Sequence, residues 1–207
     1  MEFDNIIFMR ERAVNRLGES EEKTYMDKRT VRDEILKRRS VLTLEEVKRL
    51  SRIICDMARR LESYEKAEDI CLYMPVRNEV DVGYLAKKAR NEGKNIWLPK
   101  VEGQNMNFYF CDEKTELRTG AYGIYEPVSE RILTAGDKTL VVMPGAVFSR
   151  NRDRIGYGGG YYDRFLSAHS KCMTAAVCYS FQILEEIPHE DHDVKPEALV
   201  SEKEILM

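Results

Sequence analysis

Three short apolar runs that each stop at a proline constrain the fold of this chain more than any other feature of its sequence. They cover residues 70–74, 96–98 and 140–143, and the prolines are Pro75, Pro99 and Pro144. Short runs that are apolar throughout are typical of strands buried on both faces. Residues 80–91, between the first two runs, have helical spacing and stop at Gly93. The order strand, helix, strand predicts a parallel βαβ unit with a right-handed crossover.

Sheets of this kind bind ligands outside the carboxyl ends of their strands. If the three prolines mark those ends, the segments that follow them should converge on one cleft. These segments are residues 76–81, the chain from Lys100 onward, and residues 145–163.

Helical patterns occur at three further places. Residues 27–39 form a basic amphipathic stretch, residues 44–61 keep helical spacing behind a capping box of Thr43 and Glu46, and residues 161–170 are a third helical segment. Residues 107–111 and 174–179 predict a further strand pair. Together these elements predict an α/β domain, namely a three-layer α/β/α arrangement with a mainly parallel sheet. We expect residues 26–207 to form a single domain and residues 1–25 an N-terminal extension, either a helix or a mobile arm.

The composition excludes several classes of protein. The 207 residues carry 33 Lys and Arg against 36 Asp and Glu, a formal charge of −3, which is unlike the strongly basic domains that bind nucleic acid. The five cysteines include no C-x-x-C pair and indicate neither a disulfide framework nor a zinc ribbon. No apolar run approaches the length of a membrane span. We therefore expect a cytoplasmic protein that acts on small molecules, without a nucleic-acid or membrane partner.

Four glycines fall within five positions, and tyrosines interleave or flank them. The glycines are Gly156, Gly158, Gly159 and Gly160, and the tyrosines are Tyr157, Tyr161 and Tyr162. The segment follows a predicted strand and opens a predicted helix, so its backbone N–H groups and the helix dipole favour an anion such as phosphate. It is neither a Walker A loop nor a dinucleotide fingerprint, because no G-K-[ST] follows and Tyr161 replaces the third glycine. A flexible loop without a ligand is the alternative.

The ordered motifs of the chain resemble those of the 5-formyltetrahydrofolate cyclo-ligase family, also called methenyltetrahydrofolate synthetase. The similarity extends over roughly residues 27–202. Its main element is the run 143–148 followed by 154–166, and its other motifs are residues 28–32, 73–75 with 78–81, 120–127, and 187–193. The resemblance implies a fold similar to that of sugar-phosphate isomerases and coenzyme A transferases. It implies a monomer whose substrates are ATP and a reduced folate.

The activity that the resemblance implies is the ATP- and Mg²⁺-dependent conversion of 5-formyltetrahydrofolate to 5,10-methenyltetrahydrofolate, with release of ADP and phosphate. ATP would be bound by Lys28, Arg29, Thr30, Val31, Arg32, Arg154, Ile155, Gly156, Tyr157, Gly158, Gly159, Gly160, Tyr161 and Tyr162. The folate contacts would be Met74, Glu79, Tyr122, Tyr157, Gly158, Gly159, Gly160 and Tyr161. The resemblance implies catalytic roles for Arg154 and Tyr161, and it implies that Asp163 and Asp193 hold Mg²⁺.

Each of these roles has a plainer alternative. Glu79 would otherwise cap the helix that follows it, and Asp163 would be only an acid in the first turn of its helix. The basic run 28–32 would be surface charge, and Tyr122 would belong to the core. The tail also contains His189 and His192 beside acidic residues, but it has no metalloprotease spacing and no evident third ligand for a transition metal.

The chain also departs from the family pattern at three places. Ser149 replaces the usual aspartate, Arg152 stands where glycine is common, and Pro196 with Glu197 replaces a valine–aspartate pair. Two other functions stay open on the sequence: a sugar-phosphate isomerase, and a non-catalytic ligand sensor or RNA-associated module that uses the basic helix. The first predicts no ATP dependence, and the second predicts binding that weakens steeply with salt.

Overall fold

A seven-stranded, mainly parallel sheet forms the centre of the molecule. The computed structural model describes residues 27–190 and 193–207. The strands of the sheet lie in the order β12-β11-β9-β6-β1-β2-β3, and only the pairs β2·β3 and β11·β12 are antiparallel. Their bounds are β1 Asp69–Cys71, β2 Asn95–Glu102, β3 Asn105–Phe110, β6 Thr139–Met143, β9 Met173–Val177, β11 Ala198–Val200 and β12 Ile205–Leu206.

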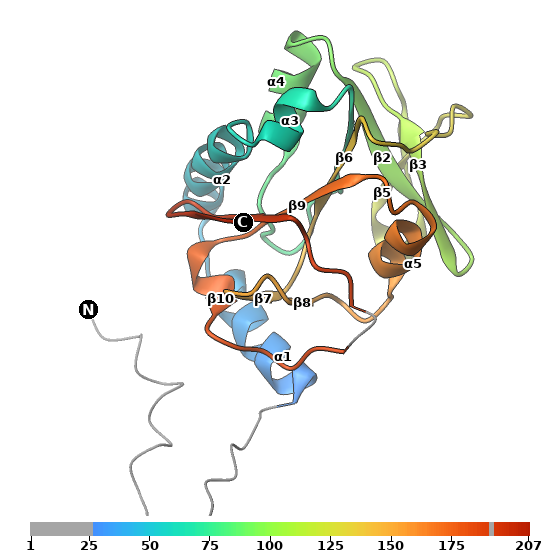
Figure 1. Ribbon diagram of the computed structural model, residues 1–207. Coiled ribbons are helices and arrows are strands. Elements are labelled where there is room, and N and C mark those ends of the chain that lie inside the picture. The colour runs from blue at the N-terminus through green and yellow to red at the C-terminus, as the bar shows by residue number, and fades with distance from the viewer. Residues whose placement is uncertain (1–26, 191–192) are drawn as a thin grey trace, which may run out of the picture.

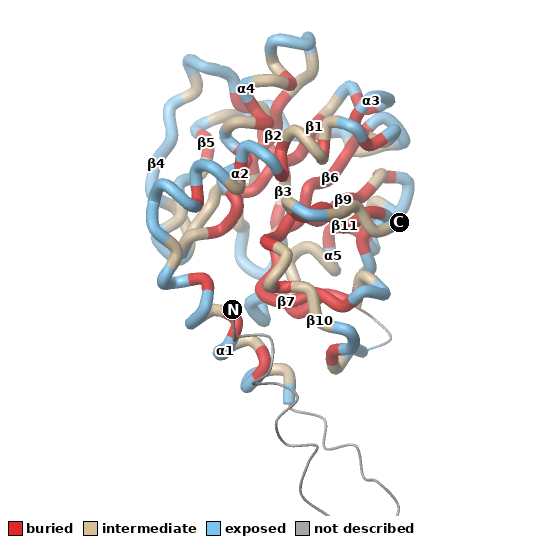
Figure 2. The backbone as a smooth tube through the Cα atoms, turned by 90° about the vertical axis from the view of Figure 1, so that its left-hand side faces the viewer, coloured by how far each residue is buried: buried red, intermediate tan, exposed pale blue. Residues whose placement is uncertain are grey.

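Side-chain alternation divides the core between the two faces of this sheet. In β6, Leu140 and Val142 belong to one buried cluster, whereas Val141 and Met143 belong to another. The first cluster is covered by the helices α2 (Leu44–Ala58), α3 (Glu62–Lys66) and α4 (Gly83–Asn91), and the second by α5 (Tyr161–Ala168). Figure 1 shows these helices on opposite sides of the sheet, and Figure 2 shows the buried strands between them. The predicted three-layer fold with a mainly parallel sheet is therefore confirmed.

A second, smaller layer of structure lies at one end of the molecule. The short strands β7 (Val147–Ser149), β8 (Arg154–Ile155) and β10 (Ile183–Leu184) form a three-stranded sheet. Helix α1 (Lys28–Ser40) packs on this sheet, because its Val31 and Ile35 share a buried cluster with Val147 and Ile155. The remaining elements are the hairpin β4 (Leu117–Thr119) and β5 (Tyr125–Pro127), with the 3₁₀ turns η1 (Ala121–Gly123) and η2 (Ser180–Gln182).

The expected end of the second strand at Pro99 is wrong. Strand β2 runs on to Glu102, and Pro99 pairs with Phe108 of β3. The Cys111 N–H donates to the Ile96 carbonyl, so the even-numbered residues of β2 exchange hydrogen bonds with β3 and the Pro99 nitrogen faces the other way. On that side β1 has already ended at Cys71, and a missing N–H therefore breaks no ladder hydrogen bond.

The other predicted elements exist with shifted bounds. The capping box of Thr43 and Glu46 is present, but α2 ends at Ala58 and α4 begins only at Gly83. The predicted strands 107–111 and 174–179 correspond to β3 and β9, which do not pair with each other. Instead β3 lies beside β2, and β9 lies between β6 and β11. The extension 1–25 lies outside the described residues.

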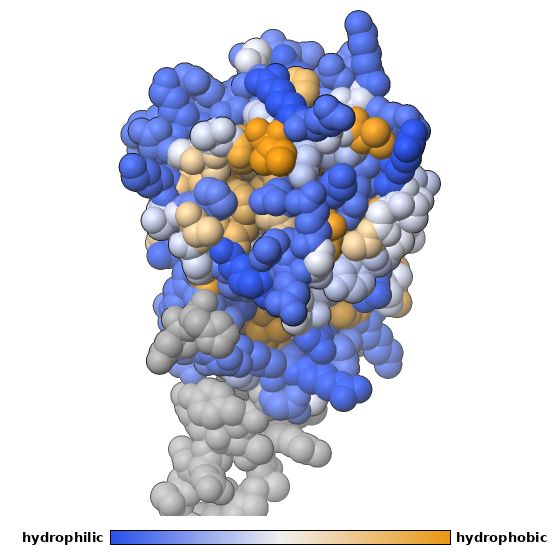
Figure 3. All heavy atoms as spheres, turned by 90° about the vertical axis from the view of Figure 1, so that its right-hand side faces the viewer, coloured by the Kyte–Doolittle hydropathy of each residue, from blue (hydrophilic) through white to orange (hydrophobic). Residues whose placement is uncertain are grey.

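The surface and the cysteines agree with the composition. All five cysteines are buried and unpaired with one another. On the side of the molecule shown in Figure 3, hydrophobic residues lie in separate groups among hydrophilic ones. Across residues 27–190 and 193–207, we find no helix whose length and hydropathy would let it cross a membrane.

Candidate functional site

The glycine loop, residues 156–160, connects β8 to α5, as the sequence predicts. Gly158 and Gly160 have φ of 92° and 62°, a left-handed backbone that favours glycine, and Gly160 is the N-cap of α5. No side chain caps this helix end. The N–H groups of the first turn of a helix have no acceptor within the helix, so the start of α5 offers donors and a positive dipole end to an anion.

Neighbouring side chains close tightly around the loop. A Cβ at Gly156 would lie 2.9 Å from Arg154 Nη1, and a Cβ at Gly159 would lie 2.7 Å from the ring of Tyr161. A Cβ at Gly158 would lie 3.9 Å from Arg32 Nη1, which brings α1 to the loop. Side chains at Gly156 and Gly159 would therefore displace Arg154 and Tyr161, two of the predicted ligand-binding residues.

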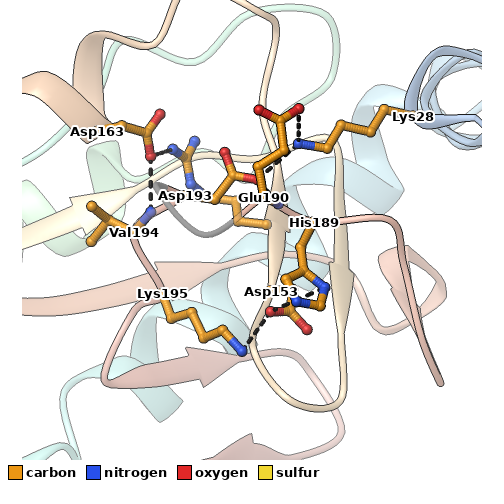
Figure 4. A network of polar contacts seen from close by, with 9 residues as sticks. Lys28, Asp153, Asp163, His189, Glu190, Asp193, Val194 and Lys195 are labelled. Atoms are coloured by element: carbon orange, nitrogen blue, oxygen red, sulfur yellow. Dashed lines mark hydrogen bonds and ion pairs between the residues drawn. The ribbon is translucent and has the colours of Figure 1, made fainter.

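A charged cluster includes Asp163 of α5, the helix that the loop opens (Figure 4). Arg154 Nη2 donates to Asp163 Oδ1 at 2.8 Å, and the same oxygen accepts from the Val194 N–H at 3.2 Å. Lys28 Nζ donates to Asp193 Oδ2 at 2.8 Å and to Glu190 Oε1 at 3.0 Å. Residues from α1, β8, α5 and the tail before β11 thus meet in one place.

The two cations of this cluster are held differently. Arg154 is buried, its Nη1 donates to the Pro144 carbonyl just after β6, and its Nε has no hydrogen-bond partner within the described part of the chain. Burial alone would lower the pKa of Lys28, but its hydrogen bonds to Asp193 and Glu190 outweigh burial and raise this pKa. Since arginine is always protonated in proteins, both side chains are positively charged at neutral pH.

A second cluster, which Tyr157 connects to the loop, contains a buried acid. Glu79 is 5% exposed; its carboxylate accepts hydrogen bonds from the Tyr157 hydroxyl and, at 2.9 Å, from the Val76 N–H. Arg39 Nη1 lies 3.9 Å from Glu79 Oε1. Burial raises the pKa of Glu79, while Tyr157, Val76 and Arg39 oppose this rise. Glu79 does not cap α4, whose N-cap is Val82, so the capping alternative is wrong.

A pair of tyrosines, one exposed and one partly buried, lies near the start of α5. The hydroxyls of Tyr122 and Tyr161 are 2.8 Å apart, and their rings make an edge contact. Tyr122 is 77% exposed and is therefore not part of the core. Tyr162 points the other way, towards Phe108 and the guanidinium of Arg154. Both Tyr161 and Tyr162 are partly buried against the cluster beneath α5, but Tyr161 reaches Tyr122 whereas Tyr162 reaches Arg154.

The predicted site residues separate into those at the loop and those that pack elsewhere. Val31 and Ile155 have buried side chains in the cluster beneath α1, which leaves only their backbone for a ligand. Thr30 bonds Asp27, the N-cap of α1, and Arg29 is exposed beside Asp33. Met74 packs against the core after β1. Their roles stay predictions.

Arg39 is the prominent site residue that sequence reasoning missed. It is 1% exposed, its Nε donates to the Arg77 carbonyl at 2.9 Å, and its guanidinium lies 5.8 Å from the centre of the Tyr157 ring. Its Nη2 has no partner among the described residues. The signal was present, because Arg39 follows Val31 and Ile35 at four-residue intervals and so lies on the buried stripe of α1.

The alternative of a transition-metal site in the tail receives no support. Of the two tail histidines, His189 is described, whereas His192 lies outside the described residues. The described part of the chain contains no group of three or more His, Cys, Asp or Glu residues arranged to hold a metal ion. Asp163 and Asp193 are a pair of carboxylates, which is the number that Mg²⁺ commonly takes from protein alongside phosphates and water.

Fold and site together define an α/β protein in which a glycine loop opens a helix close to two cations, a buried acid and a pair of tyrosines. The chain belongs to the 5-formyltetrahydrofolate cyclo-ligase family, whose model matches residues 24–202. This membership favours neither of the two other functions that the sequence left open.

Individual relatives agree with this assignment. A probable 5-formyltetrahydrofolate cyclo-ligase of Schizosaccharomyces pombe is 33% identical over 171 residues, which cover 74% of this chain and 84% of the relative. The 5-formyltetrahydrofolate cyclo-ligase of Mus musculus is 26% identical, over 84% of this chain and 93% of the relative. The solved structure of Aquifex aeolicus 5,10-methenyltetrahydrofolate synthetase superposes with a TM-score of 0.77 at 34% identity, over 87% of this chain and 92% of that one.

Proposed function

We propose that this protein closes the ring of 5-formyltetrahydrofolate to give 5,10-methenyltetrahydrofolate, using ATP and releasing ADP and phosphate. One observation carries the proposal: Arg154, two residues before the glycine loop, belongs to a charged cluster, while Tyr157 within the loop bonds a buried acid. Arg154 and the start of α5 suit phosphate groups, whereas Glu79 suits the hydrogen-bond donors of a pterin ring. A loop of five residues would hold the two reactants side by side.

The chemistry requires activation because the formyl oxygen is a poor leaving group. In the proposed reaction this oxygen attacks the γ-phosphorus, the bond to ADP breaks, and a phosphorylated formyl group forms. The N10 amine then attacks the formyl carbon, loses its proton, and phosphate leaves with the oxygen. The task of the protein is positioning and neutralisation of charge, which suits the buried Arg154 beside the loop and Tyr161 at its edge.

Asp163 and Asp193 are the residues that we propose for Mg²⁺. Val194 connects the two: it follows Asp193 directly in the chain, and its N–H donates to the Asp163 carboxylate. Bound Mg²⁺ would neutralise phosphate charge during transfer. The oxygen donors fit this ion, with phosphates and water completing its shell.

The activity is tested by incubating the purified protein with 5-formyltetrahydrofolate, MgCl₂ and ATP and following the absorbance of methenyltetrahydrofolate. We expect product only when ATP is present. Reactions without ATP, or with AMP in its place, are the controls. No ATP-dependent product would refute the proposed function.

The substitution Asp163→Asn tests the proposed metal site. It removes the negative charge beside Arg154 but keeps the size of the side chain, so we expect kcat to fall at least about tenfold and the Mg²⁺ concentration for half-maximal activity to rise. Glu204→Gln is the matched control, because Glu204 pairs with Arg150 outside the site. Full activity at the same Mg²⁺ requirement would remove Asp163 from the metal site.

We further propose that residues 26–207 are one catalytic domain and that the enzyme works as a cytoplasmic monomer on small molecules, without nucleic acid or membrane. The family match over residues 24–202 supports the domain boundary. Five buried thiols without a disulfide agree with a reducing compartment. Sedimentation at several concentrations would test the monomer.

A further inference from the structure

Four consecutive residues of the tail before β11 each contact a different part of the site or of the hairpin β7–β8. Asp193 accepts from Lys28 of α1, and the Val194 N–H bonds Asp163 of α5. The next two residues turn to the hairpin: Lys195 Nζ lies 2.6 Å from Asp153 Oδ1, and the Pro196 carbonyl accepts from Arg152 Nε at 3.1 Å. Residues 193–194 thus contact the site, whereas residues 195–196 are held by the hairpin β7–β8.

Asp153 is itself held rigidly. It is 5% exposed, and its Oδ2 accepts from the Ser149 hydroxyl at 2.7 Å. In return the Asp153 N–H donates to Ser149 Oγ at 3.0 Å. Burial would raise the pKa of Asp153, but the ion pair with Lys195 and the bond from Ser149 lower it. The carboxylate is therefore charged at neutral pH and aims one oxygen at the tail.

Arg152, in the turn of the hairpin β7–β8, has an unfavourable backbone conformation. Its φ is 66°, in the left-handed region where a residue with a Cβ costs about 1 kcal/mol relative to glycine. Glycine, which is common here in the family pattern, would relieve this cost but could not bond the Pro196 carbonyl. Pro196 is far from Ser149 and Arg152 in the sequence, but these three departures from the pattern belong to one contact network in the structure.

We infer that Arg152 and Asp153 are positioning residues of the nucleotide site, which act through Pro196 and Lys195 to hold Asp193 beside Lys28. The inference rests on the proposed function. Because successive tail residues make successive contacts, loss of the two contacts with the hairpin lets residues 193–194 move relative to α1 and α5. Nucleotide affinity should suffer, whereas the folate contacts at Glu79 and Tyr122 lie on other segments and should not.

The first test is Arg152→Gly, in which stability and nucleotide binding should change in opposite directions. Relief of the positive φ should leave the melting temperature equal or higher, while the dissociation constant for the Mg²⁺ complex of AMP-PNP, measured by calorimetry, should rise about tenfold. A merely structural role would weaken both or neither. An unchanged dissociation constant would overturn the inference.

The second test is Lys195→Met, which takes the cation from the buried Asp153 and should therefore lower the melting temperature, so circular dichroism is used to check that the variant is folded. We expect a similar tenfold rise in the dissociation constant and an unchanged KM for 5-formyltetrahydrofolate, with rescue by Lys195→Arg. Arg150→Gln is the matched control: Arg150 belongs to the same hairpin but pairs with Glu204 beyond β11, so nucleotide binding should not change.

A double variant decides whether the effect passes through Asp193. In an Asp193→Ala background, Lys195→Met should add no further loss of nucleotide affinity, whereas additive losses would overturn the inference. If the unaltered chain binds no nucleotide, the proposed function fails and the inference fails with it. If it binds and Lys195→Met binds equally well, the inference alone fails.

Discussion

The carboxylate of Glu79 is buried, and it accepts a hydrogen bond from Tyr157 of the glycine loop instead of capping α4. Glu79→Gln keeps the shape of the side chain but removes its charge. If Glu79 bonds a pterin, we expect the KM for 5-formyltetrahydrofolate to rise about tenfold and the KM for ATP to stay the same, because a charged hydrogen bond contributes about 1.5–3 kcal/mol. Steady-state kinetics with each substrate varied in turn measures both.

The matched control is Glu92→Gln, since Glu92 also accepts a hydrogen bond from a tyrosine, Tyr64, but follows α4 and bonds α3 instead of the loop. It should change neither KM. Equal effects of Glu79→Gln on folate and on ATP would contradict the assignment of Glu79 to the folate side.

Arg39 is the positive neighbour of this buried acid, and its loss should make stability depend on pH. In Arg39→Met, Glu79 stays buried without its cation, so the free energy of unfolding should fall by about 3 kcal/mol near neutral pH. Burial already raises the pKa of Glu79 above its ordinary value of 4.5, and the substitution should raise it further. The folded chain then holds a proton that the unfolded chain has lost.

Stability of Arg39→Met should therefore be greatest at acid pH and should decrease as the pH rises through the raised pKa of Glu79. Urea unfolding at about pH 5 and about pH 8 measures the difference. Adding Glu79→Gln should remove this pH dependence. A pH dependence equal to that of the unaltered chain would show that Arg39 and Glu79 are not coupled.

The site residues differ in how far the sequence reveals them. The glycines and tyrosines of residues 156–162 are adjacent in the chain and could be recognised together. Arg39, Asp153 and Lys195 come from separate segments, and nothing in the local pattern of Asp153 or Lys195 shows that the fold pairs them. Only the helical spacing of Arg39 after Val31 and Ile35 indicates burial.

Among the elements, helix α2 begins at the capping box that its local sequence predicts. The Thr43 hydroxyl accepts from the Glu46 N–H while the Glu46 carboxylate accepts from the Thr43 N–H. Thr43→Ala should therefore lower the free energy of unfolding by about 1 kcal/mol and leave kcat unchanged, because α2 lies away from the loop. Urea denaturation followed by circular dichroism is the measurement.

Ser40→Ala is the control for this element. The Ser40 hydroxyl donates to the Lys37 carbonyl at the end of α1 and caps no helix start, so its removal should cost less than that of Thr43. A larger loss for Ser40→Ala than for Thr43→Ala would show that the capping box contributes little.

Strands were predicted well where burial on both faces makes them continuously apolar, as in β6, and poorly where they are short. Strands β8 and β10 contain two residues each, which is too few to show any periodicity. The end of β2 was misplaced for a different reason. A proline ends a strand only where a neighbouring strand would accept a hydrogen bond from its N–H, and the order of strands in the sheet, which the local sequence does not show, decides which strand that is.

At the scale of the whole molecule, the charged cluster sets two cations, Lys28 and Arg154, against three carboxylates, those of Asp163, Glu190 and Asp193. A nucleotide alone would draw Lys28 and Arg154 to its phosphates and leave the three carboxylates beside negative charge. A metal ion alone would leave the two cations beside positive charge. Together the two ligands provide partners for both kinds of charge, so we expect Mg²⁺ and nucleotide to bind with positive coupling.

Calorimetry of AMP-PNP binding should show an affinity at least about tenfold higher in MgCl₂ than in EDTA. The double variant Asp163→Asn, Asp193→Asn separates coupling within the protein from the effect of the metal on the nucleotide itself. It should bind AMP-PNP with little dependence on Mg²⁺. Equal affinity of the unaltered chain in MgCl₂ and EDTA would refute the coupling.

The place of Asp193 in the chain has a consequence for synthesis. Strand β11 follows the tail and pairs with β9 of the central sheet, while Lys28 stands near the beginning of the described structure. Lys28 of α1 can therefore pair with Asp193 only after the segment that leads into β11 has been synthesised. A growing chain on the ribosome would already hold the entire glycine loop and yet be unable to assemble the proposed nucleotide site, so activity should begin only after the final strands have emerged and joined the sheet.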